Sequence, residues 1–137
     1  MLFRSELYHL LALRAAVFVV EQHCPYQDID GKDLHSLHLL AWDEDQELVA
    51  YSRLVKPGIS YAEWSIGRVV TSMKVRRKGV GKDLMERALR FLDETDSGAI
   101  RISAQCYLET FYQGFGFVSL GEPYLEDDIP HIEMLRS

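Results

Sequence analysis

Residues 65–92 read SIGRVVTSMKVRRKGVGKDLMERALRFL, and this stretch determines the predicted fold. Residues 65–72 have the pattern of a strand, in which Gly67 indicates a bulge or a close backbone approach. From residue 84 onward, apolar side chains recur at helical spacing and predict an amphipathic helix. Glycine and basic residues fill residues 74–82 between them. The stretch therefore predicts a strand, a glycine-rich basic turn and a helix.

The glycine-rich basic turn has the composition of a phosphate-binding loop. The first turn of a helix leaves about four backbone N–H groups unpaired and carries about half a positive charge. Glycine lets a phosphate come close to those amides, and a basic side chain adds charge. Arg76, Gly79 and Gly81 stand where the predicted helix begins. The alternative is a flexible turn with a solvated basic face.

Three phosphate-binding motifs can be compared with this turn. A P-loop ending at Gly81 would need glycine at residue 76 and a hydroxyl at residue 83, but these are Arg76 and Asp83. The dinucleotide motif G-x-G-x-x-G would need a third glycine where Leu84 stands. The pattern R/Q-x-x-G-x-G/A is satisfied by residues 76–81, RRKGVG.

The rest of the chain supplies more strands and helices around this stretch. A first helix follows Ser5 as N-cap, and its apolar periodicity frays at residues 18–22. Residues 121–130, GEPYLEDDIP, have the composition of an acidic loop. We expect further strands at 37–42, 47–55, 99–105, 117–120 and 131–135, and a short helix at 108–115. This order predicts an α+β or mixed α/β domain.

Length and charge limit the class of protein. The 137 residues fit a single domain, 1–137, and the formal charge of −6 disfavours a long polyanion as ligand. The chain shows no secretory signal and no apolar run near the length of a membrane span, which predicts a cytoplasmic protein with free thiols at Cys24 and Cys106. His23 beside Cys24 lacks a partner pattern for a metal, so no metal is expected.

Residues 113–120, QGFGFVSL, approach the octamer of a common RNA-binding module. That interpretation would stack bases on Phe115 and Phe117. It is disfavoured because Gln113 replaces the basic residue, Leu120 replaces the last aromatic, and the chain ends too soon for the rest of that module. We therefore expect no nucleic-acid partner.

Residues 76–81 and residues 111–117, FYQGFGF, resemble the GNAT superfamily of acetyl-coenzyme A-dependent N-acetyltransferases. Three longer stretches narrow the resemblance to the ElaA-type subgroup, and together they extend it over nearly the whole chain: 11–33, 65–70 and 124–134. The chain departs from the pattern in its opening strand, which is at best residual at Leu2–Phe3. It also departs in a shorter segment at 32–42, and in Arg77, where a small residue is common.

The resemblance implies a fold, a cosubstrate and a reaction. The fold would be a central, mostly antiparallel sheet with a splayed middle strand, flanked by helices. Acetyl-coenzyme A would donate its acetyl group to a primary amine on a small molecule or peptide, without a metal. The resemblance leaves open whether the protein forms a homodimer. The implied cofactor-binding residues are Val69, Val70, Thr71, Arg76, Arg77, Lys78, Gly79, Val80, Gly81 and Lys82.

Acetyl transfer needs an acid for the departing thiolate and a base for the amine. By resemblance, Tyr112 lies near the coenzyme A sulfur and is the expected acid, with packing as the alternative. The candidate bases are Glu21, His35, His38 and His131, of which Glu21 and His131 are preferred. A non-catalytic coenzyme A sensor on the same fold is the rival function.

Two acidic loops suggest a cationic acceptor. If both lie beside the acceptor site, their carboxylates would attract a protonated amine. A solvated acidic surface is the alternative. The residues concerned are Asp28, Asp30, Asp33, Glu126, Asp127 and Asp128.

Overall fold

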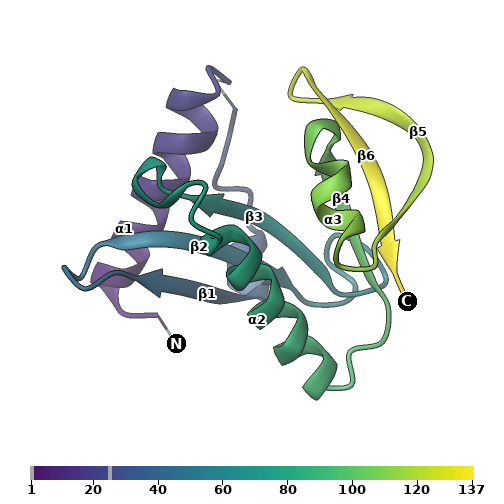
Figure 1. Cartoon of the computed structure of the whole chain (residues 1–137), viewed down its shortest axis with the longest axis horizontal. Coiled ribbons are helices and arrows are strands. Elements are labelled where there is room, and N and C mark those ends of the chain that lie inside the picture. Colours follow the sequence, from purple (N-terminus) through teal and green to yellow (C-terminus); the bar gives the residue numbers. More distant parts are fainter. Residues whose placement is uncertain (1, 25) are drawn as a thin grey trace.

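The computed structural model describes residues 2–24 and 26–137 (Figure 1). Its strands form two three-stranded antiparallel sheets, ordered β1-β2-β3 and β4-β6-β5. The strands are β1 (Ser36–Trp42), β2 (Leu48–Val55), β3 (Ser65–Thr71), β4 (Ile100–Gln105), β5 (Val118–Glu126) and β6 (Ile129–Arg136). The α-helices are α1 (Arg4–Arg14), α2 (Val80–Glu94) and α3 (Glu109–Gln113). A π-helix, Ala15–Glu21, continues α1, and short 3-10 turns cover Lys32–His35, Met73–Val75 and Cys106–Leu108.

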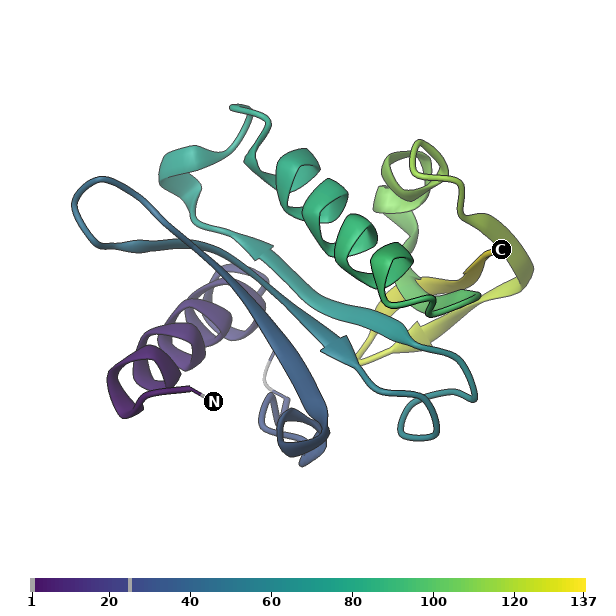
Figure 2. The same cartoon turned by 90° about the horizontal axis from the view of Figure 1, so that it is seen from below.

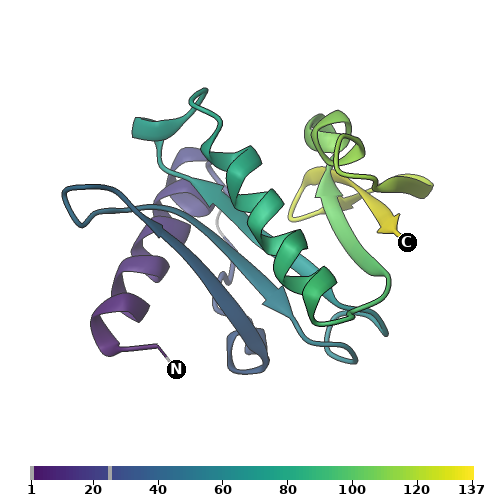
Figure 3. The same cartoon turned by 60° about the horizontal axis from the view of Figure 1, so that its bottom comes forward.

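The two sheets meet through one parallel contact and then separate. Trp64, just before β3, pairs with Ile100 at the start of β4. The Arg101 N–H donates to the Trp64 carbonyl oxygen at 2.9 Å. Beyond this point β3 and β4 diverge on either side of α2 (Figure 3). The mostly antiparallel sheet with a splayed middle strand is therefore confirmed.

Helices α1 and α2 cover opposite faces of the first sheet (Figure 2). Strand alternation explains this, because Tyr51 on β2 packs with α1 whereas Leu54 packs in the larger core with α2. The apolar stripe predicted on α2 is buried, and each large side chain in it contributes about 1.5–3 kcal/mol of burial free energy. Its members are Leu84, Met85, Ala88, Leu89 and Leu92.

Strand β3 contains the bulge that Gly67 indicated, but the positive φ angle falls on the next residue. Tyr51 pairs with Val70 and Arg53 pairs with Gly67, so one residue of β2 faces two of β3. Arg68 has φ 50°, whereas the φ of Gly67 is not positive. The bulge twists the strand at the point where it borders the space between the sheets.

The acidic loop predicted at 121–130 is wrong. Strand β5 continues to Glu126, and a two-residue turn at Asp127 and Asp128 leads directly into β6. Both turn residues have positive φ, 50° and 61°, as a tight hairpin turn requires. Pro123 favoured a loop in the prediction. Proline is tolerated here because β5 is an edge strand and its pairing with β6 has a register shift between Leu120 and Tyr124.

The N-terminal predictions also need correction. Helix α1 begins at Arg4 with Phe3 as N-cap rather than Ser5, and the Phe3 N–H donates to the Glu6 carboxylate at 2.8 Å. Leu2 and Phe3 form no strand. The fraying periodicity after residue 17 corresponds to the π-helix, whose wider turns break the α-helical spacing. No helix in the described ranges is both long and apolar enough to cross a membrane.

The burial of Phe117 and the packing of Phe115 oppose base stacking on the rings of residues 113–120. Phe117 is 2 % exposed and belongs to the main core, where it meets Tyr112 edge-to-face. Phe115 packs against the same core. The aromatic residues that resembled an RNA-binding octamer therefore hold α3 against the second sheet.

Candidate functional site

A cleft of about 840 Å³ lies between the diverging strands β3 and β4. The π-helix, the loop after it and the β5–β6 hairpin contribute the remaining walls. Predicted site residues come together here from six segments of the chain. Those lining the cleft are Glu21, Val69, Val70, Thr71, Arg76, Gly81, Tyr112 and His131. Arg77, Lys78, Gly79, Val80 and Lys82 lie in the adjoining loop and first turn of α2, outside the lining.

The first turn of α2 presents unpaired backbone donors. Gly79 is the N-cap with φ 80°, and the first intrahelical bond runs from the Asp83 N–H to its carbonyl at 3.0 Å. Within the described part of the chain, no hydrogen bond uses the N–H groups of residues 80–82. A Cβ on Gly81 would meet only Thr71 Cγ2 at 3.8 Å, an ordinary contact. No neighbour in the protein therefore requires glycine there, but an approaching anion would.

Arg76 joins the helix terminus to the opposite side of the cleft. Its Nη1 lies 2.6 Å from Glu21 Oε2, and its Nη2 donates to the Thr71 carbonyl at 3.1 Å. One predicted cofactor residue and one predicted base therefore form an ion pair. Arg77 has φ 64°, a conformation that glycine adopts without cost.

Tyr112 reaches the cleft from α3 and is 7 % exposed. Phe111 and Phe117 pack edge-to-face against its ring. Burial raises the pKa of Tyr112 above its ordinary value, so the phenol stays protonated at neutral and moderately alkaline pH. In the chain as described, its hydroxyl makes no hydrogen bond. The group is a neutral donor available to a ligand.

His131 on β6 has one ring nitrogen engaged and the other directed at a carboxylate. Nδ1 lies 2.7 Å from the Ile129 carbonyl, which can only accept, so Nδ1 carries the proton. Nε2 lies 3.4 Å from Glu126 Oε2, and in the neutral ring it is a lone-pair acceptor. The ring is 7 % exposed and stacks on Tyr124.

The other two histidine candidates lie outside the cleft. His35 is exposed on the 3-10 turn before β1. His38 donates from Nε2 to the Asp33 carbonyl at 3.1 Å and accepts at Nδ1 from the Tyr51 hydroxyl at 2.5 Å. Burial lowers the pKa of His38 and keeps it neutral. Both nitrogens of His38 are used, which makes it a structural link.

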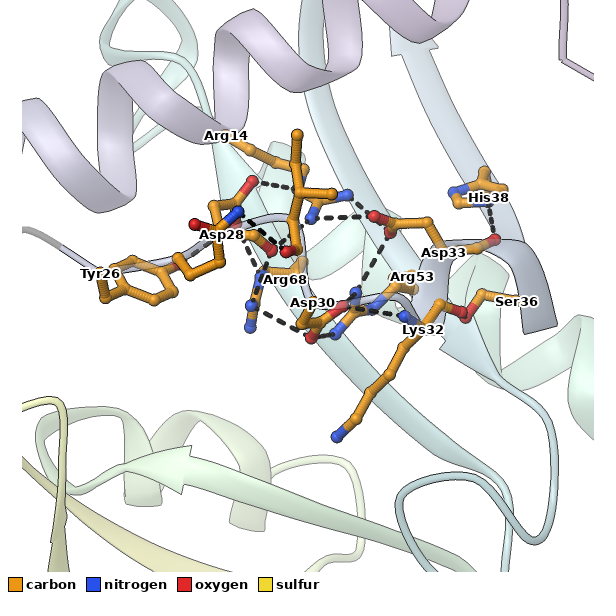
Figure 4. Close-up of polar contacts among 12 residues, drawn as sticks. Arg14, Tyr26, Asp28, Asp30, Lys32, Asp33, Ser36, His38, Arg53 and Arg68 are labelled. Atoms are coloured by element: carbon orange, nitrogen blue, oxygen red, sulfur yellow. Dashed lines mark hydrogen bonds and ion pairs between the residues drawn. The ribbon is translucent and has the colours of Figure 1, made fainter.

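The first acidic loop is neutralised by three arginines (Figure 4). Together they form what we call the arginine–aspartate cluster, made of Arg14, Arg53, Arg68, Asp28, Asp30 and Asp33. Arg14 continues the helical spacing of Leu7, Leu10 and Val17, and this position is the sequence signal from which its burial could have been found. The expectation that this loop attracts a cation is wrong, because each carboxylate already has two guanidinium partners.

The cluster ties α1 to the bulge in β3. Arg14, which is fully buried, places Nε 3.0 Å from Asp28 and Nη1 2.8 Å from Asp33. Asp28 also accepts from Arg68 Nε at 2.8 Å. The side chain of the strained bulge residue is thereby fixed from a separate segment, and the bulge keeps its conformation.

Acid should weaken the cluster. Burial alone would raise the pKa of Asp30, but hydrogen bonds from Arg53 outweigh it and hold that pKa well below the ordinary value. A depressed folded-state pKa contributes stability that is present above the unfolded pKa, about 4, and is lost as the pH falls further. We expect constant stability from this group between pH 5.5 and 7 and a progressive loss below about pH 4.

The variant Asp30→Asn isolates this contribution. We expect it to be about 1–2 kcal/mol less stable at pH 7 and to lose less stability than the parent between pH 4 and 2. Urea titrations followed by circular dichroism across that range measure both quantities. Parallel pH curves for the two proteins would contradict the assignment.

A thiol contact links the two walls of the cleft at one end. Cys24 Sγ, buried beyond the π-helix, lies 3.2 Å from the Asp127 carbonyl in the β5–β6 turn. Glu126 and Asp127 both line the cleft, and neither carboxylate has an arginine or lysine partner in the ranges the structure describes. This wall of the cleft is therefore acidic.

Comparison with known proteins identifies the family. The model of the acetyltransferase (GNAT) domain matches residues 8–137. Protein ElaA of Escherichia coli K12 is 48 % identical over 135 residues, covering 96 % of this chain and 88 % of that protein. Its crystal structure superposes with a TM-score of 0.91 at 47 % identity, covering 99 % of this chain and 93 % of that one. An acyl-CoA N-acyltransferase from Pseudomonas aeruginosa gives 0.91 at 48 % identity, with the same coverage of both chains.

Both the extent of the match and the identity are far above what a shared fold alone would produce. They extend over the β3–α2 segment, α3 and the β5–β6 hairpin, the parts that line the cleft. The chain therefore belongs to the GNAT family of acetyltransferase domains, whose members transfer acyl groups from coenzyme A thioesters.

Proposed function

We propose that this protein transfers an acetyl group from acetyl-coenzyme A to a primary amine. The observation that carries the proposal is the shared cleft. It has unpaired amides of α2 at one end, and a protonated phenol and a free imidazole nitrogen along its walls. These are an anion site, an acid and a base in one space.

The diphosphate of coenzyme A would bind at the first turn of α2. The N–H groups of Val80, Gly81 and Lys82 would donate to it, with charge from Arg76, Arg77 and Lys78. The pantetheine arm would then run along β3, where backbone groups of Val69, Val70 and Thr71 border the cleft. The bulge at Arg68 turns the strand there, so an amide can point toward the thioester carbonyl and polarise it.

The reaction then requires two proton movements. The amine nitrogen forms a bond to the carbonyl carbon, and the carbon–sulfur bond breaks. Tyr112 donates its proton to the departing sulfur, which leaves as the free thiol. His131 accepts the proton lost by the amine at Nε2, directly or through one water, and Glu126 stabilises the charged ring. Proton exchange with solvent restores both groups.

Glu21 has a different role in this scheme. Its carboxylate is held by Arg76 at 2.6 Å, and taking up a proton would break that ion pair. We assign it to positioning the Arg76 guanidinium at the diphosphate end of the cleft. His131 is therefore the preferred base of the two.

A thiol-release assay tests the proposal. Purified protein with acetyl-coenzyme A and a panel of primary amines should liberate coenzyme A thiol only when an amine is present, with an equal amount of N-acetylated product by mass spectrometry. The rival, a coenzyme A sensor, predicts tight binding by calorimetry without transfer to any amine. That second result would overturn the enzymatic proposal.

Replacing either proton-transfer group should lower turnover more than cofactor affinity. Tyr112→Phe should reduce kcat about tenfold, which is below the usual range of roughly 100- to 10,000-fold for a general acid, because a thiolate is a good leaving group. His131→Gln should cost about tenfold at pH 7 and less at pH 9, where more amine is unprotonated. Steady-state kinetics measure both, and Tyr8→Phe, which changes an exposed tyrosine outside the cleft, is the matched control. An unchanged kcat would remove that residue from the mechanism.

A further inference from the structure

We infer that the acceptor carries a carboxylate as well as an amine, and that Lys32 binds this carboxylate. The inference rests on the proposed function and adds the acceptor's chemical class. It starts from the end of the cleft farthest along β3 from the first turn of α2. The polar residues that line this end are Tyr26, Gln27, Asp30, Lys32, Arg53, Ser60, Tyr61 and Arg68.

The charges behind this end of the cleft cancel. The arginine–aspartate cluster has three cations and three anions, and every carboxylate lies within 3.3 Å of a guanidinium nitrogen. Burial would raise the pKa of Asp30 and Asp33, but hydrogen bonds from Arg53 and Arg14 lower it, so these two carboxylates keep their charge at neutral pH. The cluster therefore gives the acceptor a polar but neutral wall, contrary to what the acidic sequence of the loop suggested.

Lys32 is a cation at this wall that does not belong to the arginine–aspartate cluster. Its backbone N–H donates to Asp30 Oδ1 at 3.1 Å, which fixes the main chain. Its ammonium group makes no hydrogen bond or ion pair with the residues described, and it extends away from the cluster (Figure 4). Because Lys32 also lines the cleft, its positive charge is available to a ligand there.

The opposite wall has the opposite charge. Glu126 and Asp127 border the cleft beside His131, the proposed base. A cation attracted to these carboxylates would bring its amine to Nε2 of His131. An acceptor with one positive and one negative group would thus be oriented by the two walls, its amine at His131 and its carboxylate at Lys32. A single lysine beside a neutral cluster matches one negative charge, which favours a carboxylate over a phosphate.

Matched acceptor pairs test this inference. β-Alanine, 4-aminobutyrate, 6-aminohexanoate and the α-amino acids are each offered as the free acid and as the carboxamide. Rates are compared per unprotonated amine, because the two forms differ in amine pKa. We expect kcat/KM to favour the acid by about tenfold for at least one spacing, which corresponds to one charge-assisted hydrogen bond at a half-buried site.

Three variants assign the preference to Lys32. Lys32→Ala should remove the preference for the acid over the carboxamide while leaving the carboxamide rate within about twofold. Lys32→Arg, which keeps the positive charge, should retain the preference. Lys56→Ala, which removes an exposed lysine outside the cleft, should leave it intact. Equal rates for acids and amides, or an equal fall for both in Lys32→Ala, would overturn the inference.

Binding keeps this test separate from the test of the enzymatic function. Calorimetry on the coenzyme A-saturated protein compares 6-aminohexanoate and the α-amino acids with their amides. If no acceptor is acetylated but acids bind about tenfold tighter than amides through Lys32, the proposed function fails and the carboxylate site stands. If acetylation occurs without a Lys32-dependent preference, the proposed function stands and the carboxylate site fails. Preference for phosphorylated amines over carboxylates would also overturn the inference.

Discussion

Replacing Arg14 with alanine is expected to lower the free energy of unfolding by about 3–4 kcal/mol. The guanidinium is fully buried and donates to Asp28 and Asp33 at 3.0 and 2.8 Å. Its removal takes one guanidinium partner from each of two partly buried carboxylates, and it opens a space beside Tyr51. The loss stays near the lower end for a broken buried ion pair, because Arg68 and Arg53 still contact those aspartates.

Equilibrium urea denaturation measures this loss, and Arg87→Ala is the matched control. Arg87 forms one ion pair with Asp83 at 3.3 Å, and both side chains are exposed. Its removal should change stability by less than about 0.5 kcal/mol. Arg14→Lys keeps the charge without the bidentate geometry and should lose about half as much, which gives a value even if the alanine variant does not fold. A loss below about 1 kcal/mol for Arg14→Ala would mean that the cluster is not stabilising.

The fold was largely predictable because its elements have strong local signals. The stripe from Leu84 to Leu92 has a helical period, and the buried strands are bounded by turn residues. The β5–β6 hairpin was missed because Gly121 and Pro123 usually indicate a loop, and the turn residues Asp127 and Asp128 look like part of an acidic surface. Edge-strand tolerance for proline depends on which strands are neighbours, and local sequence does not contain that information.

Positions that line the cleft were predicted most directly where they belong to a contiguous motif. Gly81 and Tyr112 lie in short patterns, and both line the cleft. The arginine–aspartate cluster draws on residues as far apart as Asp28 and Arg68, and ion pairing over such separations leaves no local pattern. Composition therefore suggested a negative surface where the structure has a neutral one. This difference matters for the inferred acceptor, because a neutral wall beside Lys32 is the basis for proposing a molecule with both charges.

Replacing Gly81 with aspartate is expected to weaken coenzyme A binding at least 100-fold while the protein stays folded. The new carboxylate would lie in the first turn of α2, pair with the free N–H groups and repel the diphosphate. Two like charges about 4 Å apart near a protein surface repel by up to about 4 kcal/mol. The fold should be unharmed, because a Cβ at this position meets only Thr71 Cγ2 at 3.8 Å and an acidic residue favours a helix N-terminus.

Calorimetry with coenzyme A, together with thermal unfolding of the free protein, separates binding from stability. Gly81→Ala tests the added side chain without charge, and we expect a smaller loss. Arg90→Gln makes the same change in net charge at an exposed position farther along α2, and should bind normally. Because the aspartate substitution favours the helix while opposing the ligand, lost affinity with an unchanged or higher melting temperature would place the diphosphate at this turn. Unchanged affinity would place the diphosphate elsewhere and remove the anion site on which acyl transfer in this cleft depends.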